Sequence, residues 1–204
     1  MEREVAPVNT APYGLGMTRR PRLDRQDWLA AGFRKLADVG PSGLKAEVLA
    51  RDLGTTKGSF YWHFADLTAY KAALLAEWRD KAATAIMAGI DENAAPADRL
   101  KALIAAAKAP PPETYGGRRI EPAIRAWALN SSDVAAVLAA VDTDRIAFVH
   151  RLLSDLGAPD PATAMVFYAA YLGLDDIAAR HSPDAVDALD HLSAMIFASA
   201  QDKT

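Results

Sequence analysis

One short segment of this chain reads Gly54-Thr55-Thr56-Lys57-Gly58-Ser59-Phe60-Tyr61-Trp62-His63-Phe64. Its last five residues all carry rings, and on a helix five consecutive rings point around the whole circumference instead of along one buried stripe. The two phenylalanines are four residues apart, so they share one face and we expect both to enter a core. The three rings between them point elsewhere, and each has a polar tip suited to a phosphate or to a groove wall.

The residues on either side define two short helices joined by a tight turn. Leu44 to Leu53 has the apolar spacing of one helix, and Gly54 stops it because glycine accepts the left-handed conformation after a helix end. Thr56 is a good N-cap for the next helix, whose first turn holds Lys57 and Ser59 beside a free N-terminal dipole. Two such helices predict a helix-turn-helix, whose second helix enters the major groove of DNA.

Residues 50–64 resemble the signature of TetR/AcrR-type transcriptional regulators, roughly I/L-A-x-x-x-G-[VT]-[ST]-x-[GP]-[ST]-[LFI]-Y-x-[HY]-F. The match is dense, and it is more specific than a bare helix-turn-helix. The resemblance implies an all-α fold: an N-terminal three-helix helix-turn-helix DNA-binding domain and a C-terminal helical ligand-binding and dimerisation domain. We expect the following residues to bind DNA: Lys45, Thr55, Thr56, Lys57, Gly58, Ser59, Tyr61, Trp62 and His63.

Two positions depart from the family pattern. Lys45 stands where the family usually has Ser or Thr as a helix cap. Lysine cannot cap a helix N-terminus, although it can neutralise a phosphate, so Ser42 is the alternative cap. Leu67 stands where the family usually has Lys, which predicts the loss of one phosphate contact, whereas Asp66 can still cap the helix that follows.

Charge is distributed unevenly along the 204 residues, which suffice for one or two domains. Residues 1–65 have a net charge of +3 and residues 66–204 a net charge of −6, so the half with the motif is the basic one. The chain has no cysteine, which excludes disulfides and thiolate chemistry. It also has no apolar run of membrane-spanning length and no signal peptide, so we expect a cytoplasmic protein without a membrane partner.

The predicted organisation has three parts. Residues 1–23 form a basic, flexible arm, which is either a disordered tail or a segment that lays Arg19, Arg20 and Arg22 along the DNA. Residues 24–65 form the helix-turn-helix DNA-binding domain, and residues 66–204 form the effector-binding and dimerisation domain. About nine helices are expected in all, at residues 25–39, 44–53, 56–64, 67–90, 97–109, 118–130, 132–156, 161–180 and 183–200, with a flexible link at Gly116-Gly117.

The helix near the C-terminus is apolar on almost every side between Thr163 and Leu174. Such a helix is buried on most of its circumference, which places core on one side and a second subunit on the other. The resemblance implies the same arrangement, because the family dimerises through its last two helices. Ala164, Ala169 and Gly173 are small enough to permit close approach, so we predict a homodimer.

The second domain holds more aromatic residues than a helical core of its size commonly uses, which favours a small-molecule pocket. The candidate ligand-binding residues are Trp78, Arg125, Trp127, Phe148, Tyr168 and Asp175. Two alternatives stay open: the rings simply fill a core, and Glu121, Arg125 and Trp127 make a salt bridge and a core tryptophan.

Catalytic and metal sites have little support in the sequence. None of the four histidines, at positions 63, 150, 181 and 191, has the spacing of metal ligands, and no phosphate-binding loop or nucleophile elbow is present. Asp175-Asp176 with His181 is a conceivable metal cluster, but a solvated helix end explains it equally. We therefore expect no enzyme, no cofactor and no metal.

The preferred hypothesis is a dimeric transcriptional repressor that a small-molecule effector releases from a palindromic double-stranded DNA operator. A ligand-independent, architectural DNA-binding dimer is the first alternative, and a missing internal cavity would support it. A helical enzyme is the second, and a solvent-open cleft with converging titratable groups would favour it.

Overall fold

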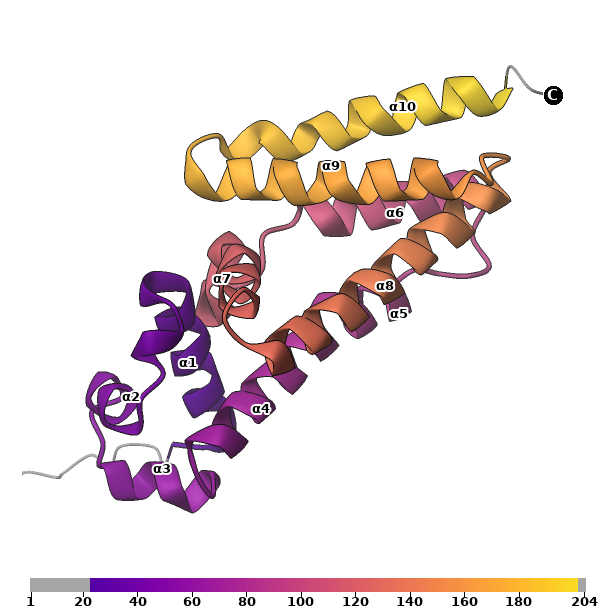
Figure 1. Ribbon diagram of the computed structural model, residues 1–204. Helices are drawn as coiled ribbons and strands as arrows, with labels where there is room; N and C mark the ends of the chain where they lie inside the picture. The colour runs from indigo at the N-terminus through magenta and orange to yellow at the C-terminus, as the bar shows by residue number, and fades with distance from the viewer. Residues whose placement is uncertain (1–22, 202–204) are drawn as a thin grey trace, which may run out of the picture.

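The computed structural model describes residues 23–201 and, within them, contains helices, turns and loops but no strand, which confirms the all-α prediction (Figure 1). Arg19, Arg20 and Arg22 of the predicted arm lie outside the described residues. Helices α1 to α3 form one end of the molecule, and α9 and α10 form the other. The helices are α1 (Arg25–Val39), α2 (Ala46–Asp52), α3 (Lys57–His63), α4 (Leu67–Arg79), α5 (Ala85–Ala88), α6 (Pro96–Lys108), α7 (Ile120–Ala128), α8 (Ser132–Asp155), α9 (Pro161–Arg180) and α10 (Ala188–Gln201).

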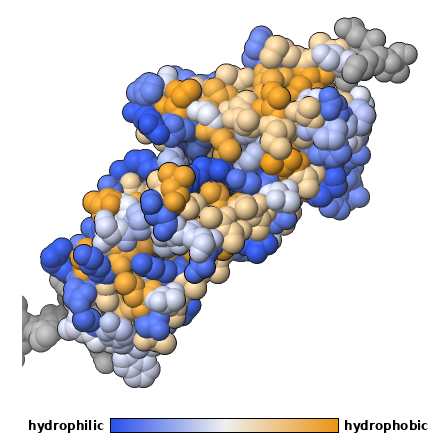
Figure 2. Space-filling model, viewed as in Figure 1, coloured by the Kyte–Doolittle hydropathy of each residue, from blue (hydrophilic) through white to orange (hydrophobic). Residues whose placement is uncertain are grey.

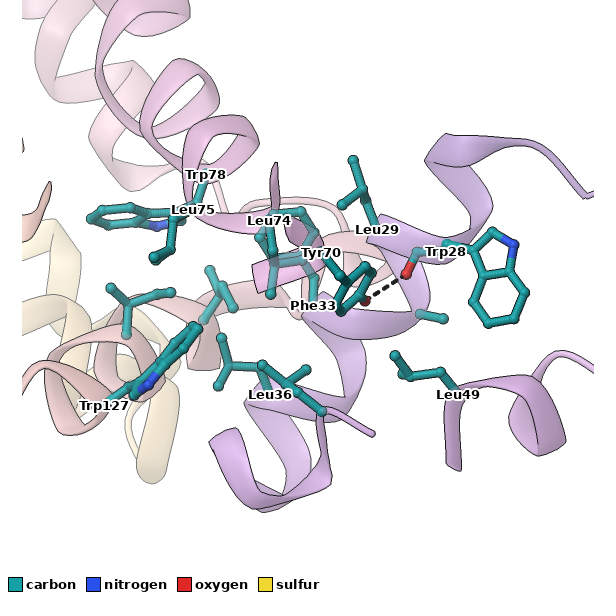
Figure 3. Close-up of a cluster of buried hydrophobic side chains, with 14 of the residues drawn as sticks. Trp28, Leu29, Phe33, Leu36, Leu49, Tyr70, Leu74, Leu75, Trp78 and Trp127 are labelled. Atoms are coloured by element: carbon teal, nitrogen blue, oxygen red, sulfur yellow. Dashed lines mark hydrogen bonds between the residues drawn. The ribbon is translucent and has the colours of Figure 1, made fainter. Parts of the chain in front are cut away.

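Helix α1 is fixed at its start by a reciprocal cap. The Asp27 backbone N–H donates to Asp24 Oδ1 at 2.9 Å, and the Asp24 backbone N–H donates to Asp27 Oδ2 at 2.8 Å. The apolar stripe that follows is buried from Trp28 to Leu36. The Tyr70 hydroxyl of α4 donates to the Trp28 carbonyl at 2.8 Å, so α1 and α4 are tied by a buried hydrogen bond as well as by packing (Figure 3).

One hydrophobic core joins the helix-turn-helix to the rest of the chain. It runs from Leu49 on α2, through Phe33 on α1, to Trp78 on α4 and Trp127 on α7 (Figure 3). Helix α1 lies between these contacts, with α2 on one side and α4 and α7 on the other. Helix α1 therefore packs against both α4 and α7 and against the rest of the helix-turn-helix.

The expected flexible link at Gly116-Gly117 is instead ordered and buried, which corrects the sequence-based prediction. It belongs to two short 3₁₀ turns, η3 (Glu113–Tyr115) and η4 (Gly117–Arg119), which pack against α1. Gly116 has a φ of +88°, and a Cβ added there would lie 2.9 Å from the Ala37 Cβ and 3.1 Å from the Phe33 carbonyl oxygen. Glycine is needed because the backbone is left-handed and α1 approaches closely.

The single helix predicted over residues 67–90 is interrupted by a π-helical turn, Asp80–Thr84, between α4 and α5. If these three segments are counted as one helix, residues 23–201 contain the nine expected helices. Arg145 of α8 donates to the carbonyl of Ala82 inside this turn, from Nε at 3.3 Å and from Nη2 at 3.1 Å. A π turn inside an α-helix often marks a functional position, and this one lies on the helix that leads from α3 into the second domain.

The far end of the molecule exposes an unusual amount of apolar surface. Met165 and Val166 on α9 are 52% and 60% exposed, and Met195 on α10 is 49% exposed. Figure 2 shows apolar surface gathered over this end on the side in view. The last helix also begins later than predicted, because Pro183–Asp187 forms a 3₁₀ turn and α10 starts at Ala188. No helix among the described residues has the length and apolar character needed to cross a membrane.

Candidate DNA-reading surface and effector cavity

One face of helix α3 is buried in the core, and the other is exposed to solvent. Phe60 and Phe64 are 0% and 3% exposed, and Phe60 meets the Trp28 ring edge-on at a centroid distance of 5.4 Å. Trp62 and Tyr61, by contrast, are 79% and 48% exposed. The division between the phenylalanines and the rings beside them is the one that the four-residue spacing predicts.

The remaining residues of the predicted DNA-binding set lie around the same end of the molecule. Those that are exposed are Lys45, Thr56, Lys57 and Gly58, and those that are half-buried are Thr55, Ser59 and His63. Thr56 occupies the N-cap position of α3 with an extended backbone, but its side chain makes no capping hydrogen bond, so the predicted side-chain cap is absent. Ser42 does not cap α2 either, because its hydroxyl donates to the Val39 carbonyl and Lys45 takes the N-cap position without a side-chain cap.

Two side-chain contacts connect α3 to α1 and α2, and neither was predicted from the sequence. Arg25 of α1 donates from Nη1 to the carbonyl of His63 at 3.0 Å, and its guanidinium lies 4.5 Å from the Phe64 ring centroid. Lys57 Nζ pairs with the carboxylate of Glu47 on α2. The hydrogen bond from Lys57 lowers the pKa of Glu47, and the same contact raises the pKa of Lys57, so both groups keep their charges at neutral pH.

A cavity of about 360 Å³ lies between the helix-turn-helix and the C-terminal helices. Its wall includes Phe33 of α1, Trp78 of α4, the π turn, η3, η4 and α7 to α9. A smaller cavity of about 60 Å³ adjoins it. Residues shared by the two walls are Ala82, Ile86, Ala107, Arg145 and Tyr171.

The six candidate pocket residues are divided by the structure. Trp78 and Asp175 line the larger cavity, and Phe148 and Tyr168 line the smaller one. Arg125 and Trp127 are not among the lining residues of either cavity. Trp127 instead packs into the core described above, and Arg125 forms ion pairs, as the alternative interpretation proposed.

Several wall residues were missed by sequence reasoning: Phe33, Lys81, Pro111, Pro112, Tyr115, Arg118, Arg145 and Tyr171. The apolar spacing of the first helix predicted a core position for Phe33, and Tyr171 was one of the aromatic residues that favoured a pocket but was not named as a ligand contact. The proline run and the glycine pair around Tyr115 were the available signal, because they bend the chain back onto α1.

Buried charges line one side of the cavity and are matched to one another. Arg145 donates from Nη1 to Glu121 Oε1 at 3.1 Å and to the Tyr168 hydroxyl at 3.1 Å, and from Nη2 to Glu121 Oε2 at 3.2 Å. With the bonds from Nε and Nη2 to the Ala82 carbonyl, all five N–H groups of this guanidinium have acceptors. Glu121 is only 8% exposed, so its charge depends on this arginine and on Arg125.

The network continues along α7 and α8. Arg125 donates to both carboxylate oxygens of Asp142, at 3.1 and 2.7 Å, and the Tyr168 hydroxyl donates to Asp142 Oδ1 at 2.6 Å. Burial opposes the ionisation of Asp142, but these hydrogen bonds and the charges of Arg125 and Arg145 outweigh it, and its pKa lies below the ordinary value. Burial raises the pKa of Tyr168 to about 12.

Asp175 forms a separate buried pair on α9. Arg118 Nη1 donates to its Oδ1 at 2.6 Å, and Arg118 Nη2 donates to the Lys108 carbonyl. Burial raises the pKa of Asp175, and the pair with Arg118 offsets only part of this rise. The neighbouring Asp176 accepts hydrogen bonds from Arg180. Within residues 23–201, no group of three or more potential ligands is placed to hold a metal.

Comparisons with known proteins support the fold. No protein-family model matches the chain, and no curated protein matches it. Among solved structures, a transcriptional regulator from Rhodococcus sp. Rha1 aligns with a TM-score of 0.73 and 21% identity over 87% of this chain and 98% of that chain. A Rhodococcus sp. protein assigned to the TetR family of transcriptional regulators aligns with a TM-score of 0.69 and 24% identity, over 84% of this chain and 96% of that chain. NemR of E. coli in its reduced form aligns with a TM-score of 0.66 and 21% identity, over 83% of this chain and 96% of that chain. The chain therefore shares the fold of these regulators.

Proposed function

We propose that the protein is a DNA-binding transcriptional regulator of the TetR type that acts as a dimeric repressor and leaves its operator when a small molecule fills the cavity. The observation that carries the proposal is the split face of α3. Two phenylalanines anchor this helix in the core, while Tyr61, Trp62 and Lys57 stand outward. Side chains of these types contact DNA phosphates and base edges.

The exposed apolar face of α9 supports the dimer. Val166, Ala169, Gly173 and Ile177 recur every three or four residues, which places them on one side of the helix. All four are exposed, and a Cβ added to Gly173 would meet no atom within 4 Å. A second copy packed there by two-fold symmetry would bury this face, and two-fold symmetry in the protein matches a palindromic operator.

Val166→Asp tests the dimer, because it places a charge in the proposed interface. We expect this variant to sediment as a monomer at micromolar concentration and to keep its helical circular dichroism. Asp184→Asn, an exposed change in the turn before α10, is the control. A wild-type monomer under the same conditions would rule the dimer out.

The position of the cavity supports effector release. Its wall includes Phe33, which belongs to α1, and Trp78, which belongs to α4, so an occupant touches both helices that hold the helix-turn-helix. An occupant changes DNA affinity only if it favours one placement of the two recognition helices over another. A coupling of about 1–3 kcal/mol is enough for regulation.

Selection of bound duplexes from a random DNA pool tests the central part of the proposal. We expect the recovered sites to converge on a palindrome whose half-sites are about 10 base pairs apart or a multiple of that distance. Tyr61→Phe should weaken binding about equally on all sites, since a phenol that contacts phosphate positions the protein without specifying a sequence. Failure of the pool to converge, with well-folded dimeric protein, would contradict the proposal.

A further inference from the structure

The charged groups around the cavity leave no free charge for a ligand. Arg145 and Arg125 are matched to Glu121 and Asp142, and every N–H of Arg145 already has an acceptor. Arg118 is matched to Asp175. The remaining cation in the wall, Lys81, pairs with Glu77 at 3.2 Å and lies 4.5 Å from the centroid of the Tyr115 ring.

This paired arrangement disfavours a charged ligand on energetic grounds. An ion that enters an apolar cavity loses its hydration, and the loss is recovered only by a countercharge that is free to pair with it. A ligand carboxylate would have to displace Glu121 or Asp175 from its arginine, which would leave a buried carboxylate unpaired, or compete with Glu77 for the half-exposed Lys81. A ligand ammonium could reach a free acceptor, but every carboxylate of the wall is already neutralised by an arginine, so the ligand would bring an uncompensated charge into the cavity.

The rest of the wall suits an aromatic body. Rings of Phe33, Trp78, Tyr115 and Tyr171 surround the cavity together with the pyrrolidines of Pro111 and Pro112. Of the eleven other lining residues, six are alanine or isoleucine and five are the paired charged residues described above. Flat rings and prolines offer large apolar contact faces with few torsions to fix, which favours a planar guest.

Two polar atoms of the wall are still available. Among the described residues, no hydrogen bond reaches the Tyr171 hydroxyl, and Arg118 uses only Oδ1 of Asp175. In the described part of the chain, the fully buried side-chain nitrogen and oxygen atoms without a hydrogen-bond partner are Trp28 Nε1 and Arg99 Nε. The Tyr171 hydroxyl and Asp175 Oδ2 are not among them, so both atoms remain accessible. The two residues are four apart on α9, so they share one face of that helix.

We infer that the effector is an uncharged, largely aromatic molecule that carries a hydroxyl or N–H group, which donates to Asp175 and lies beside the Tyr171 hydroxyl. That this molecule is an effector rests on the proposed function, whereas its chemistry follows from the cavity wall alone. A donor on the guest satisfies the free carboxylate oxygen without disturbing the pair with Arg118.

Four naphthalenes with the same ring body test the inference by calorimetry at pH 7 on the full-length protein without DNA. They are 2-naphthol, which is neutral and has a donor, 2-methoxynaphthalene, which is neutral without one, 2-naphthoate, an anion, and 2-naphthylmethylammonium, a cation. We expect 2-naphthol to bind most tightly, with the methoxy compound about tenfold weaker and both ions weaker still. If either ion binds as tightly as 2-naphthol, or if none of the four binds up to its solubility, the inference is overturned.

Two variants locate the binding groups. Tyr171→Phe should weaken 2-naphthol by several-fold and leave 2-methoxynaphthalene unchanged, and Tyr61→Phe on α3 is the matched control that should alter neither. Asp175→Asn should release Arg118, so that 2-naphthoate gains affinity while 2-naphthol loses it. Unchanged affinities for all four compounds in both cavity variants would overturn the assignment.

DNA release is measured separately from this series. Tight binding of 2-naphthol that leaves DNA affinity untouched would refute effector control while the ligand chemistry stands. Release of DNA by 2-naphthoate but not by 2-naphthol would refute the ligand chemistry while effector control stands.

Discussion

The helix-turn-helix and the cavity region differ in how far their ion pairs are exposed to water. At the helix-turn-helix, Lys57 and Glu47 form an ion pair whose side chains are 49% and 62% exposed. Beside the cavity, Arg145 and Glu121 form a pair whose side chains are 11% and 10% exposed. Water can replace either partner of the first pair, whereas the second pair is largely shielded from water.

This difference in exposure indicates which of the two ion pairs can exchange a partner for a ligand. An exposed pair contributes little to stability, so Lys57 can leave Glu47 for a DNA phosphate or base at small cost. A buried, fully hydrogen-bonded pair is costly to break, so the network beside the cavity stays intact and a ligand must fit around it. The exposed face of α3, which we propose reads DNA, is therefore adaptable, whereas the cavity is preorganised.

Removal of Glu121 should have the largest effect. Glu121→Ala leaves Arg145 and Arg125 with too few acceptors in a buried site, and we expect the free energy of unfolding to fall by about 3–5 kcal/mol. Urea unfolding monitored by circular dichroism measures the change. Glu47→Ala, which removes the same group at the exposed end, is the control and should leave stability within error. Equal losses in the two variants would remove the contrast between the regions.

A substitution at Gly116 should disturb the contact between the cavity wall and α1. Gly116→Ala combines a left-handed backbone with a clash against Ala37 and Phe33, and we expect a loss of about 1–3 kcal/mol. Gly157→Ala is the matched control, because Gly157 has a φ of +87° and open space around it, so this variant reports the backbone strain alone. A loss at Gly116 no greater than that at Gly157 would show that η3 does not press on α1.

Substitution at the exposed ion pair should change DNA binding without changing the fold. Lys57→Ala should lower the slope of log affinity against log salt by about 1 if the lysine meets a phosphate. Glu47→Gln should raise affinity for unrelated duplexes, because it removes a negative charge next to DNA and frees Lys57. Fluorescence anisotropy with a specific and a scrambled duplex measures both. Salt slopes that match the wild type in both variants would place the pair outside the DNA contact.

The pH dependence of stability sharpens the contrast within the buried region. Asp142 has a lowered pKa in the folded state, so its stabilising effect is present above pH 4 and is lost as the pH falls through the folded value. Asp175 has a raised pKa, so its contribution is full below about pH 4 and declines as the pH rises through the folded value.

The deficit of Asp142→Asn relative to wild type should therefore shrink as the pH is lowered, and that of Asp175→Asn should shrink as the pH is raised. Urea unfolding between pH 3 and pH 7 measures both deficits. Parallel curves for the two variants would contradict the assignment of these carboxylates.

The sequence predicted what depends on neighbours along the chain. The cap at Asp66, the buried spacing of Phe60 and Phe64, and the bounds of α9 follow from local patterns, and each is present in the structure. The π turn and the packing of Gly116 against α1 are set by contacts between distant segments, which no local pattern records. The cavity wall has the same origin, because Phe33, Tyr115 and Arg145 meet there from separate elements.

The most direct test of the account is the linkage between the cavity and the DNA-reading surface. The affinity of the dimer for its selected duplex should fall about 5- to 150-fold when 2-naphthol saturates the protein, and the duplex should lower the affinity for 2-naphthol by the same factor. Both factors can be measured by titration in one buffer. An unchanged DNA affinity at saturating 2-naphthol, with calorimetry confirming that the cavity is filled, would contradict the account.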